Sequence, residues 1–111
     1  MDRAEAIEKA GGNVDLAREL LGMLLQELPQ LRDLLQQAIA QENQEAMWDH
    51  AHKIYGATAY CGVPGLRQSA SAMESAVKAR QPDDIRHQFL ALNEAIQQLL
   101  EQGPAHLSQS W

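Results

Sequence analysis

The sequence predicts an all-α protein, an antiparallel four-helix bundle with a short additional N-terminal helix. Three observations lead to this fold class. Apolar residues recur three and four positions apart through four long stretches, which is the period of an amphipathic helix. No stretch alternates between apolar and polar residues as a strand does, and β-branched residues are sparse. The connections between the stretches are short, which favours antiparallel neighbours in a bundle.

The first expected helix covers residues 2–10, and a pair of glycines ends it. Asn13 is a good N-cap for the second helix, which covers residues 14–41. The apolar stripe of the second helix is wide, and this indicates burial against more than one neighbour. Pro29 removes one hydrogen-bond donor from this helix, so we expect it to kink the helix without ending it.

The third helix is expected over residues 44–61, with Asn43 as its N-cap and Gly62 as its stop. A turn follows, and the fourth helix covers residues 64–80 with Pro64 at its first position. Proline suits that position because the missing N–H would have no partner inside the helix.

The last helix is expected to begin at Pro82, with two acids in its opening turn, and to end at Gly103 and Pro104. The chain has 111 residues, enough for a single core. We therefore expect one domain over residues 1–104 and a C-terminal tail over residues 105–111.

The composition excludes several classes of function. The formal net charge is −6, which argues against nucleic acid or an anionic membrane surface as the main partner. No apolar run approaches the roughly 20 residues that span a bilayer, so no membrane contact is expected. The single cysteine, Cys61, leaves no internal disulfide framework, which is typical of a reducing, cytoplasmic setting.

The third helix presents a histidine to solvent. Its apolar positions fall on one side, at spacings of three and four, and are Met47, Ala51, Ile54, Thr58 and Cys61. His52 lies opposite them, with Gly56 one turn further along and Ala59 near it. A glycine inside a helix costs about 1 kcal/mol relative to alanine. Bare backbone beside an exposed imidazole indicates that something large approaches His52.

Imidazole can accept a phosphoryl group and release it again, provided that the active sites of donor and acceptor can reach it. Lys53 lies on the adjacent face and could place its ammonium near a phosphoryl oxygen. The sequence contains no P-loop and no nucleophile elbow. A phosphoryl carrier needs neither, because the Mg²⁺ and the acceptor carboxylate can belong to the partner. We therefore expect no cofactor, no metal site and no autonomous catalysis in this chain.

Residues 51–62 resemble the signature of histidine-containing phosphotransfer (HPt) domains, which has a His, a Gly four residues later and a second Gly ten residues after the His. The resemblance extends over most of the chain, including Leu28 and Pro29 in the second helix. The turn at residues 62–64 and the context of Tyr60 look most like the C-terminal HPt module of hybrid sensor kinases of the BarA/GacS type.

The resemblance implies that His52 takes a phosphoryl group from the aspartate of a receiver domain in a hybrid sensor kinase. It then implies transfer to the aspartate of a response-regulator receiver. We expect Mg²⁺ on the receiver, a monomeric carrier, and a cytoplasmic location in which the chain can be part of a membrane-bound sensor histidine kinase.

Many members of the family carry Lys where this chain has Tyr55, which leaves Lys53 as the alternative cation. The family also has a polar residue on the following helix that orients the imidazole, and spacing assigns this role to Glu74, with Ser71 one turn away. The residues expected to stabilise the phosphoryl group or to contact the receiver are thus Lys53, Tyr55, Gly56, Ala59 and Glu74.

Other readings of the same residues remain open. His50 is the rival phosphoacceptor, but it falls at the edge of the apolar face, where a partly buried histidine with its hydrogen bonds satisfied is the ordinary outcome. His50 and His52 point apart on a helix and cannot share a metal ion. Cys61 is more typical of a small core residue than of a redox nucleophile. His87 and His106 are expected to be solvated.

The alternative function is a helical adaptor, a structural bundle in which His52 is never phosphorylated. An adaptor has no need for a solvent-facing histidine with a glycine one turn away. Position 52 therefore distinguishes the two functions, and the sequence favours the carrier.

Overall fold

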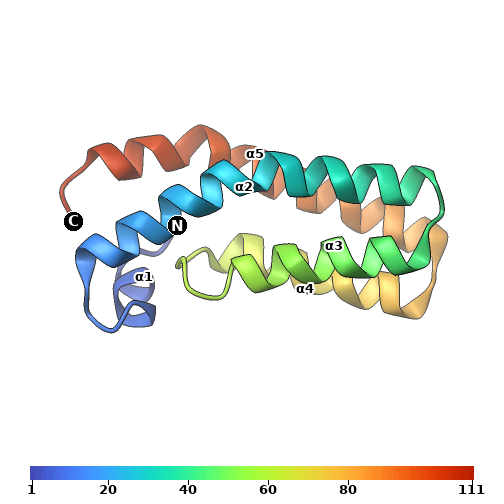
Figure 1. Ribbon diagram of the computed structural model, residues 1–111, viewed down its shortest axis with the longest axis horizontal. Coiled ribbons are helices and arrows are strands. Elements are labelled where there is room, and N and C mark those ends of the chain that lie inside the picture. Colours follow the sequence, from blue (N-terminus) through green and yellow to red (C-terminus); the bar gives the residue numbers. More distant parts are fainter.

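The computed structural model describes residues 1–111 and contains helices but no strand. The helices are α1 (Arg3–Lys9), α2 (Val14–Ala40), α3 (Gln44–Ala57), α4 (Pro64–Ala79) and α5 (Pro82–Ser108). Helices α2 to α5 run antiparallel, and each packs against two neighbours, in the cyclic order α2, α3, α4, α5 (Figure 1). The predicted four-helix bundle with a short additional helix is confirmed. None of its helices is both long and apolar enough to cross a lipid bilayer.

The starts of the helices follow from their capping residues. The side chains of Asp2, Asn13 and Asn43 each accept a hydrogen bond, of 3.0 to 3.1 Å, from the backbone N–H of the third residue of the helix that follows. Such caps stabilise a helix by about 1 kcal/mol each. Pro64 and Pro82 are the first residues of α4 and α5. Pro29 lies inside α2 without ending it, as predicted.

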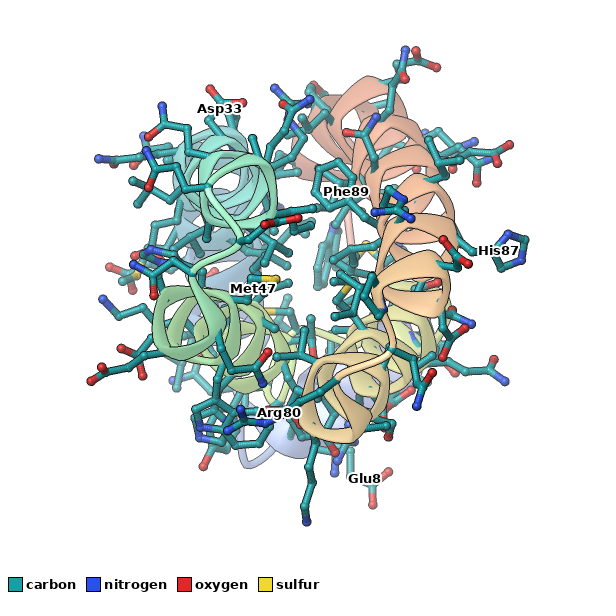
Figure 2. All side chains as sticks on the ribbon, turned by 90° about the vertical axis from the view of Figure 1, so that its right-hand side faces the viewer. Glu8, Asp33, Met47, Arg80, His87 and Phe89 are labelled. Atoms are coloured by element: carbon teal, nitrogen blue, oxygen red, sulfur yellow. The ribbon has the colours of Figure 1, made fainter.

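The core is built from the apolar stripes of the four long helices. The largest fully buried apolar side chains are Leu21, Leu28, Leu35, Ile54, Met73, Val77, Leu92 and Ile96. Figure 2 looks along the bundle from the end with the α2–α3 and α4–α5 connections, and there Met47 points inward while His87 points away. The five residues of the predicted α3 stripe are all at most 7% exposed. The buried side of α3 is thus fixed, and His52 must lie on the opposite side.

Helix α3 ends earlier than the sequence indicated. We expected it to reach Cys61, but it ends at Ala57, and turns occupy the residues up to Gly62. The hydroxyl of Thr58 donates to the carbonyl of Tyr55 at 2.7 Å, and the N–H of Thr58 is shared between two carbonyls of the last turn. This local bonding competes with a further helical turn. Ala59 consequently lies beyond the helix, not on its exposed face.

Helix α5 ends later than the sequence indicated. The expectation that Gly103 and Pro104 end it is wrong, because the helix continues to Ser108 and includes most of the expected tail. Gly103 is buried where α5 crosses α2, and a Cβ on it would lie 2.7 Å from the Leu25 side chain. Leu107 packs against the core, and its carbonyl accepts a hydrogen bond of 2.5 Å from Arg18. These contacts outweigh the hydrogen bond that a proline removes.

The two ends of the chain meet at one end of the bundle (Figure 1). Arg3 of α1 donates to Nδ1 of His106, and the indole N–H of Trp111 donates to the His106 carbonyl at 2.6 Å. His106 was expected to be solvated, but it is half-buried. Burial and the neighbouring Arg3 guanidinium lower the pKa of His106 below its usual value. The terminal residues are therefore part of the folded structure.

Gly62 holds α1 against the turn that follows α3. Its carbonyl accepts a hydrogen bond of 2.7 Å from the N–H of Asp2, and its φ is +63°, in the left-handed region. A Cβ at this position would overlap the carbonyl of Asp2 and lie 2.7 Å from the Cβ of Ala6. Only glycine fits both the backbone conformation and the contact.

Replacing Gly62 by Ala is therefore expected to destabilise the protein by at least 2 kcal/mol, roughly the strain of a left-handed alanine plus the displacement of α1. The measurement is urea unfolding followed by circular dichroism. Gly65→Ala is the matched control, because a Cβ on Gly65 meets no atom within 4 Å. Equal stability of the two variants would show that α1 does not depend on this contact.

Candidate functional site

The site is built around His52 on the outer side of α3. The imidazole side chain is 64% exposed, so the predicted exposure is confirmed. Because the opposite side of α3 is locked into the core, the ring cannot turn inward without unfolding the helix. His52 is thus a nucleophilic side chain on a rigid element, open to a large molecule.

Glu74 of α4 fixes the imidazole from one edge. Its Oε1 lies 2.5 Å from Nδ1 of His52, and its side chain is only 16% exposed. A carboxylate only accepts hydrogen bonds, so Nδ1 is the donor and carries the ring proton. The lone pair of the neutral ring then lies on Nε2, the nitrogen that points away from Glu74. The residue that spacing assigned to the orienting role is in contact with the imidazole.

Trp48 lies against the face of the same imidazole. It precedes His52 by one helical turn, and the two ring centroids are 5.5 Å apart with their planes inclined by 16°. The tryptophan is 37% exposed. The sequence analysis did not assign a role to Trp48, although a helical i, i+4 spacing of two aromatic rings could have indicated this stacking.

Gly56 leaves open space next to His52. It is exposed, and a Cβ built on it would have no atom of another element within 4 Å. Neither packing nor an unusual backbone conformation requires glycine here, since the residue lies inside α3. The glycine therefore weakens the helix, and no contact in the free domain compensates for this loss of stability.

A shallow apolar hollow lies beside Gly56, between α2 and the end of α3. The residues that line it are Leu20, Met23, Leu24, Glu27, Gly56, Ala57, Tyr60 and Cys61. Met23 and Tyr60 are 50% and 59% exposed, and both lie at this one hollow. Sequence reasoning missed Met23 because it lies on α2, and only the packing of α2 on α3 brings it near Gly56.

Beside His52, the surface between α3 and α4 is more polar than the apolar hollow between α2 and α3. Tyr55 is half-buried between α3 and α4, and the Arg67 guanidinium lies 5.7 Å from the centre of its ring. Ser71 lines a shallow hollow next to this pair. Lys53 is exposed and takes part in none of the ion pairs of the chain. The Arg67 guanidinium is thus placed against Tyr55. Lys53, on the adjacent face of α3, is free to meet an anion.

His50 and Cys61 have other environments. His50 is half-buried as expected, and its enclosed Nδ1 has no hydrogen-bond partner within the protein. Cys61 is 3% exposed, and its thiol lies 3.5 Å from the carbonyl of Ala57. Burial, assisted by the negative charge of Glu27, raises the pKa of Cys61 to about 11. The cysteine therefore stays a thiol at neutral pH and acts as a core residue, as predicted.

Known proteins share both the sequence and the fold of this chain. The family model of the Hpt domain matches residues 19–102. The sensor protein GacS of Pseudomonas syringae pv. syringae is 36% identical over 94 residues, which are 85% of this chain and 10% of GacS. The signal transduction histidine-protein kinase BarA of Shigella flexneri is 33% identical over 93 residues, which are 83% of this chain and 10% of BarA. The chain thus spans a small part of the length of these curated relatives.

A solved structure gives the same result at the level of the fold. The crystal structure of the HPT domain from a hybrid histidine kinase of Shewanella matches with a TM-score of 0.89 and 31% identity, covering 99% of this chain and 95% of that chain. The structural match includes α1 and the end of α5, which lie outside the residues that the family model matches. The chain therefore belongs to the Hpt domain family, the histidine-containing phosphotransfer carriers of two-component signalling.

Proposed function

We propose that this domain is a phosphorelay carrier in which Nε2 of His52 accepts a phosphoryl group from a receiver-domain aspartate and passes it to a second receiver. The observation that supports this most directly is the exposed imidazole whose Nδ1 is held at 2.5 Å by Glu74. This contact leaves the lone pair of Nε2 free and directed away from the domain. Open backbone at Gly56 then gives a partner room to approach.

The transfer step follows from this geometry. The lone pair of Nε2 attacks the phosphorus of the aspartyl phosphate, the P–O bond to the aspartate breaks, and the aspartate leaves as a carboxylate. The proton on Nδ1 stays between His52 and Glu74, where the carboxylate compensates the positive charge of the phosphorylated ring. The same steps in reverse deliver the group to the second receiver. No general base is needed, because Nε2 carries no proton when it attacks.

The receiver supplies the Mg²⁺ in this proposal, and this chain supplies the surface. We assign the apolar hollow with Met23 and Tyr60 to contact with the receiver, because exposed apolar side chains of this size favour a protein partner over water. Lys53 is assigned to the phosphoryl oxygens, since its ammonium has no partner in the domain. Tyr55 and Ala59 contribute only to the shape of the surface.

The proposed partners are the receiver of a hybrid sensor kinase as donor and the receiver of a response regulator as acceptor, in the cytoplasm. The relatives that match are a sensor protein and a histidine-protein kinase, which supports a position of this chain in such a relay. The acidic net charge of −6 does not favour nucleic acid. A domain that presents its site on one side of a monomer can meet the two receivers in turn.

The proposal is tested by incubating the domain with a receiver domain that carries a ³²P-labelled aspartyl phosphate. We expect the label to appear on the domain and to be lost in acid but not in base, as phosphoramidates are. A second, unlabelled receiver should then remove the label. A domain that receives no label from receivers of hybrid sensor kinases would instead be the helical adaptor.

A further inference from the structure

We propose that Trp48 is a positioning residue for phosphoryl transfer at His52, because its indole stacks on the imidazole face while Glu74 holds the ring edge. This inference rests on the proposed function of His52 as the phosphoacceptor. It concerns how the ring is held, and it assigns a role to a residue outside the spacing of His and Gly that identifies the site.

The surroundings of Trp48 indicate a role at the imidazole of His52. The side chain is 37% exposed and does not belong to the apolar core. The indole N–H has no hydrogen-bond partner, in contrast to that of Trp111. The stacking with His52, at 5.5 Å and 16°, is the one aromatic contact that Trp48 makes. Trp48 therefore lies outside the core, on the helix surface and against the imidazole.

The stacking supplies a restraint that Glu74 alone does not. One hydrogen bond to Nδ1 fixes the edge of the ring but leaves the ring free to swing about that bond. The indole occupies one of the two faces and lies nearly parallel to the imidazole, so it limits this motion. Nε2 is thereby kept on the open side, toward an incoming phosphorus. Orientation of a nucleophile is a large part of catalysis, and a misplacement of about 1 Å can slow a reaction 10²-fold.

The same contact favours the product. After attack, the imidazole carries the phosphoryl group on Nε2 and the proton on Nδ1, so the ring is cationic. The face of an indole attracts a cation through its quadrupole. Trp48 is therefore expected to act on the reaction itself, without touching the receiver.

The test uses potassium phosphoramidate, a small donor that phosphorylates imidazole without any protein partner. In this reaction the P–N bond of the donor breaks, ammonia leaves and the bond from phosphorus to Nε2 forms. We expect Trp48→Ala to slow the phosphorylation of His52 about tenfold at saturating phosphoramidate, with a smaller effect on the concentration for half-maximal rate. Trp48→Phe keeps an aromatic face and should restore the rate to within about twofold of the wild type.

Leu90→Ala is the matched control, since Leu90 is a large apolar residue, 68% exposed, on α5, which does not contact α3. It should react at the wild-type rate. A Trp48→Ala protein that also reacts at the wild-type rate would overturn the inference. So would a variant that is slow with a phosphorylated receiver but normal with phosphoramidate, because Trp48 would then be only a docking contact.

A fluorescence measurement on a protein that keeps Trp48 tests the inference without relying on the folding of Trp48→Ala. The chain has two tryptophans, so Trp111→Phe leaves Trp48 as the single tryptophan emitter. Its fluorescence should change as His52 is phosphorylated, and an unchanged spectrum would contradict the stacking. Absence of any label on the wild type, from phosphoramidate and from receivers alike, would instead refute the proposed function of His52.

Discussion

His52→Gln is expected to abolish acid-labile labelling of the domain by a phosphorylated receiver. Glutamine has similar polarity and length but offers no ring nitrogen for attack, so no phosphoramidate bond can form. An exposed substitution usually changes stability by less than about 0.5 kcal/mol. Here Glu74, whose side chain is only 16% exposed, loses its partner, and this raises the expected loss to about 1 kcal/mol. The measurements are labelling in a single turnover and a thermal melt of each variant.

His50→Gln is the control, because it changes the other histidine of the same helix. The enclosed Nδ1 of His50 has no hydrogen-bond partner, so glutamine removes no bond there and labelling should remain at the wild-type rate. Label retained in His52→Gln and lost in His50→Gln would reverse the assignment of the phosphoacceptor. Loss of label in both, with both proteins folded, would indicate that the helix surface as a whole was altered.

The helix starts could be predicted from sequence, while two helix ends could not. Asn13 and Asn43 bond to N–H groups three residues away, and such local contacts are visible in the sequence. The end of α5 depends on residues far away in the chain, because the segment after Pro104 is held by Arg18 and by packing on the core. Proline and glycine end helices on average, but tertiary contacts override this preference here.

The functional site also contains residues that the sequence could place and residues that it could not. His52 and Gly56 share the open side of one helix, so the period of the helix was sufficient to place them together. Glu74 was assigned through family resemblance and spacing, and the structure brings it to Nδ1 of His52. The hollow with Met23 and Tyr60 depends on how α2 packs against α3, and no pattern within one helix contains that information.

Gly56→Glu is expected to give a folded protein whose phosphotransfer with a receiver is slowed at least tenfold. Folding should be preserved because the position is exposed and a side chain there meets no atom of another element within 4 Å. Glutamate is also the better helix former, by up to about 1 kcal/mol. The new side chain would project beside His52 into the space that a receiver must occupy. Its negative charge would also oppose the incoming phosphoryl group.

Gly56→Ala separates the two reasons for which a glycine can occupy this position. If only the helix mattered, alanine and glutamate would both be harmless or stabilising. If the receiver must close over the bare backbone, the rate should fall in the order glycine, alanine, glutamate, although both variants are more stable than the wild type. A barrier increase of about 1.4 kcal/mol is enough for a tenfold effect, so a modest displacement of the receiver suffices.

The decisive comparison is made with phosphoramidate as the donor, which is small enough to pass the new side chain. Gly56→Glu should be much less impaired with phosphoramidate than with the receiver. If a receiver instead transfers to a well-folded Gly56→Glu protein at the wild-type rate, there is no reason to place the docking surface at this glycine.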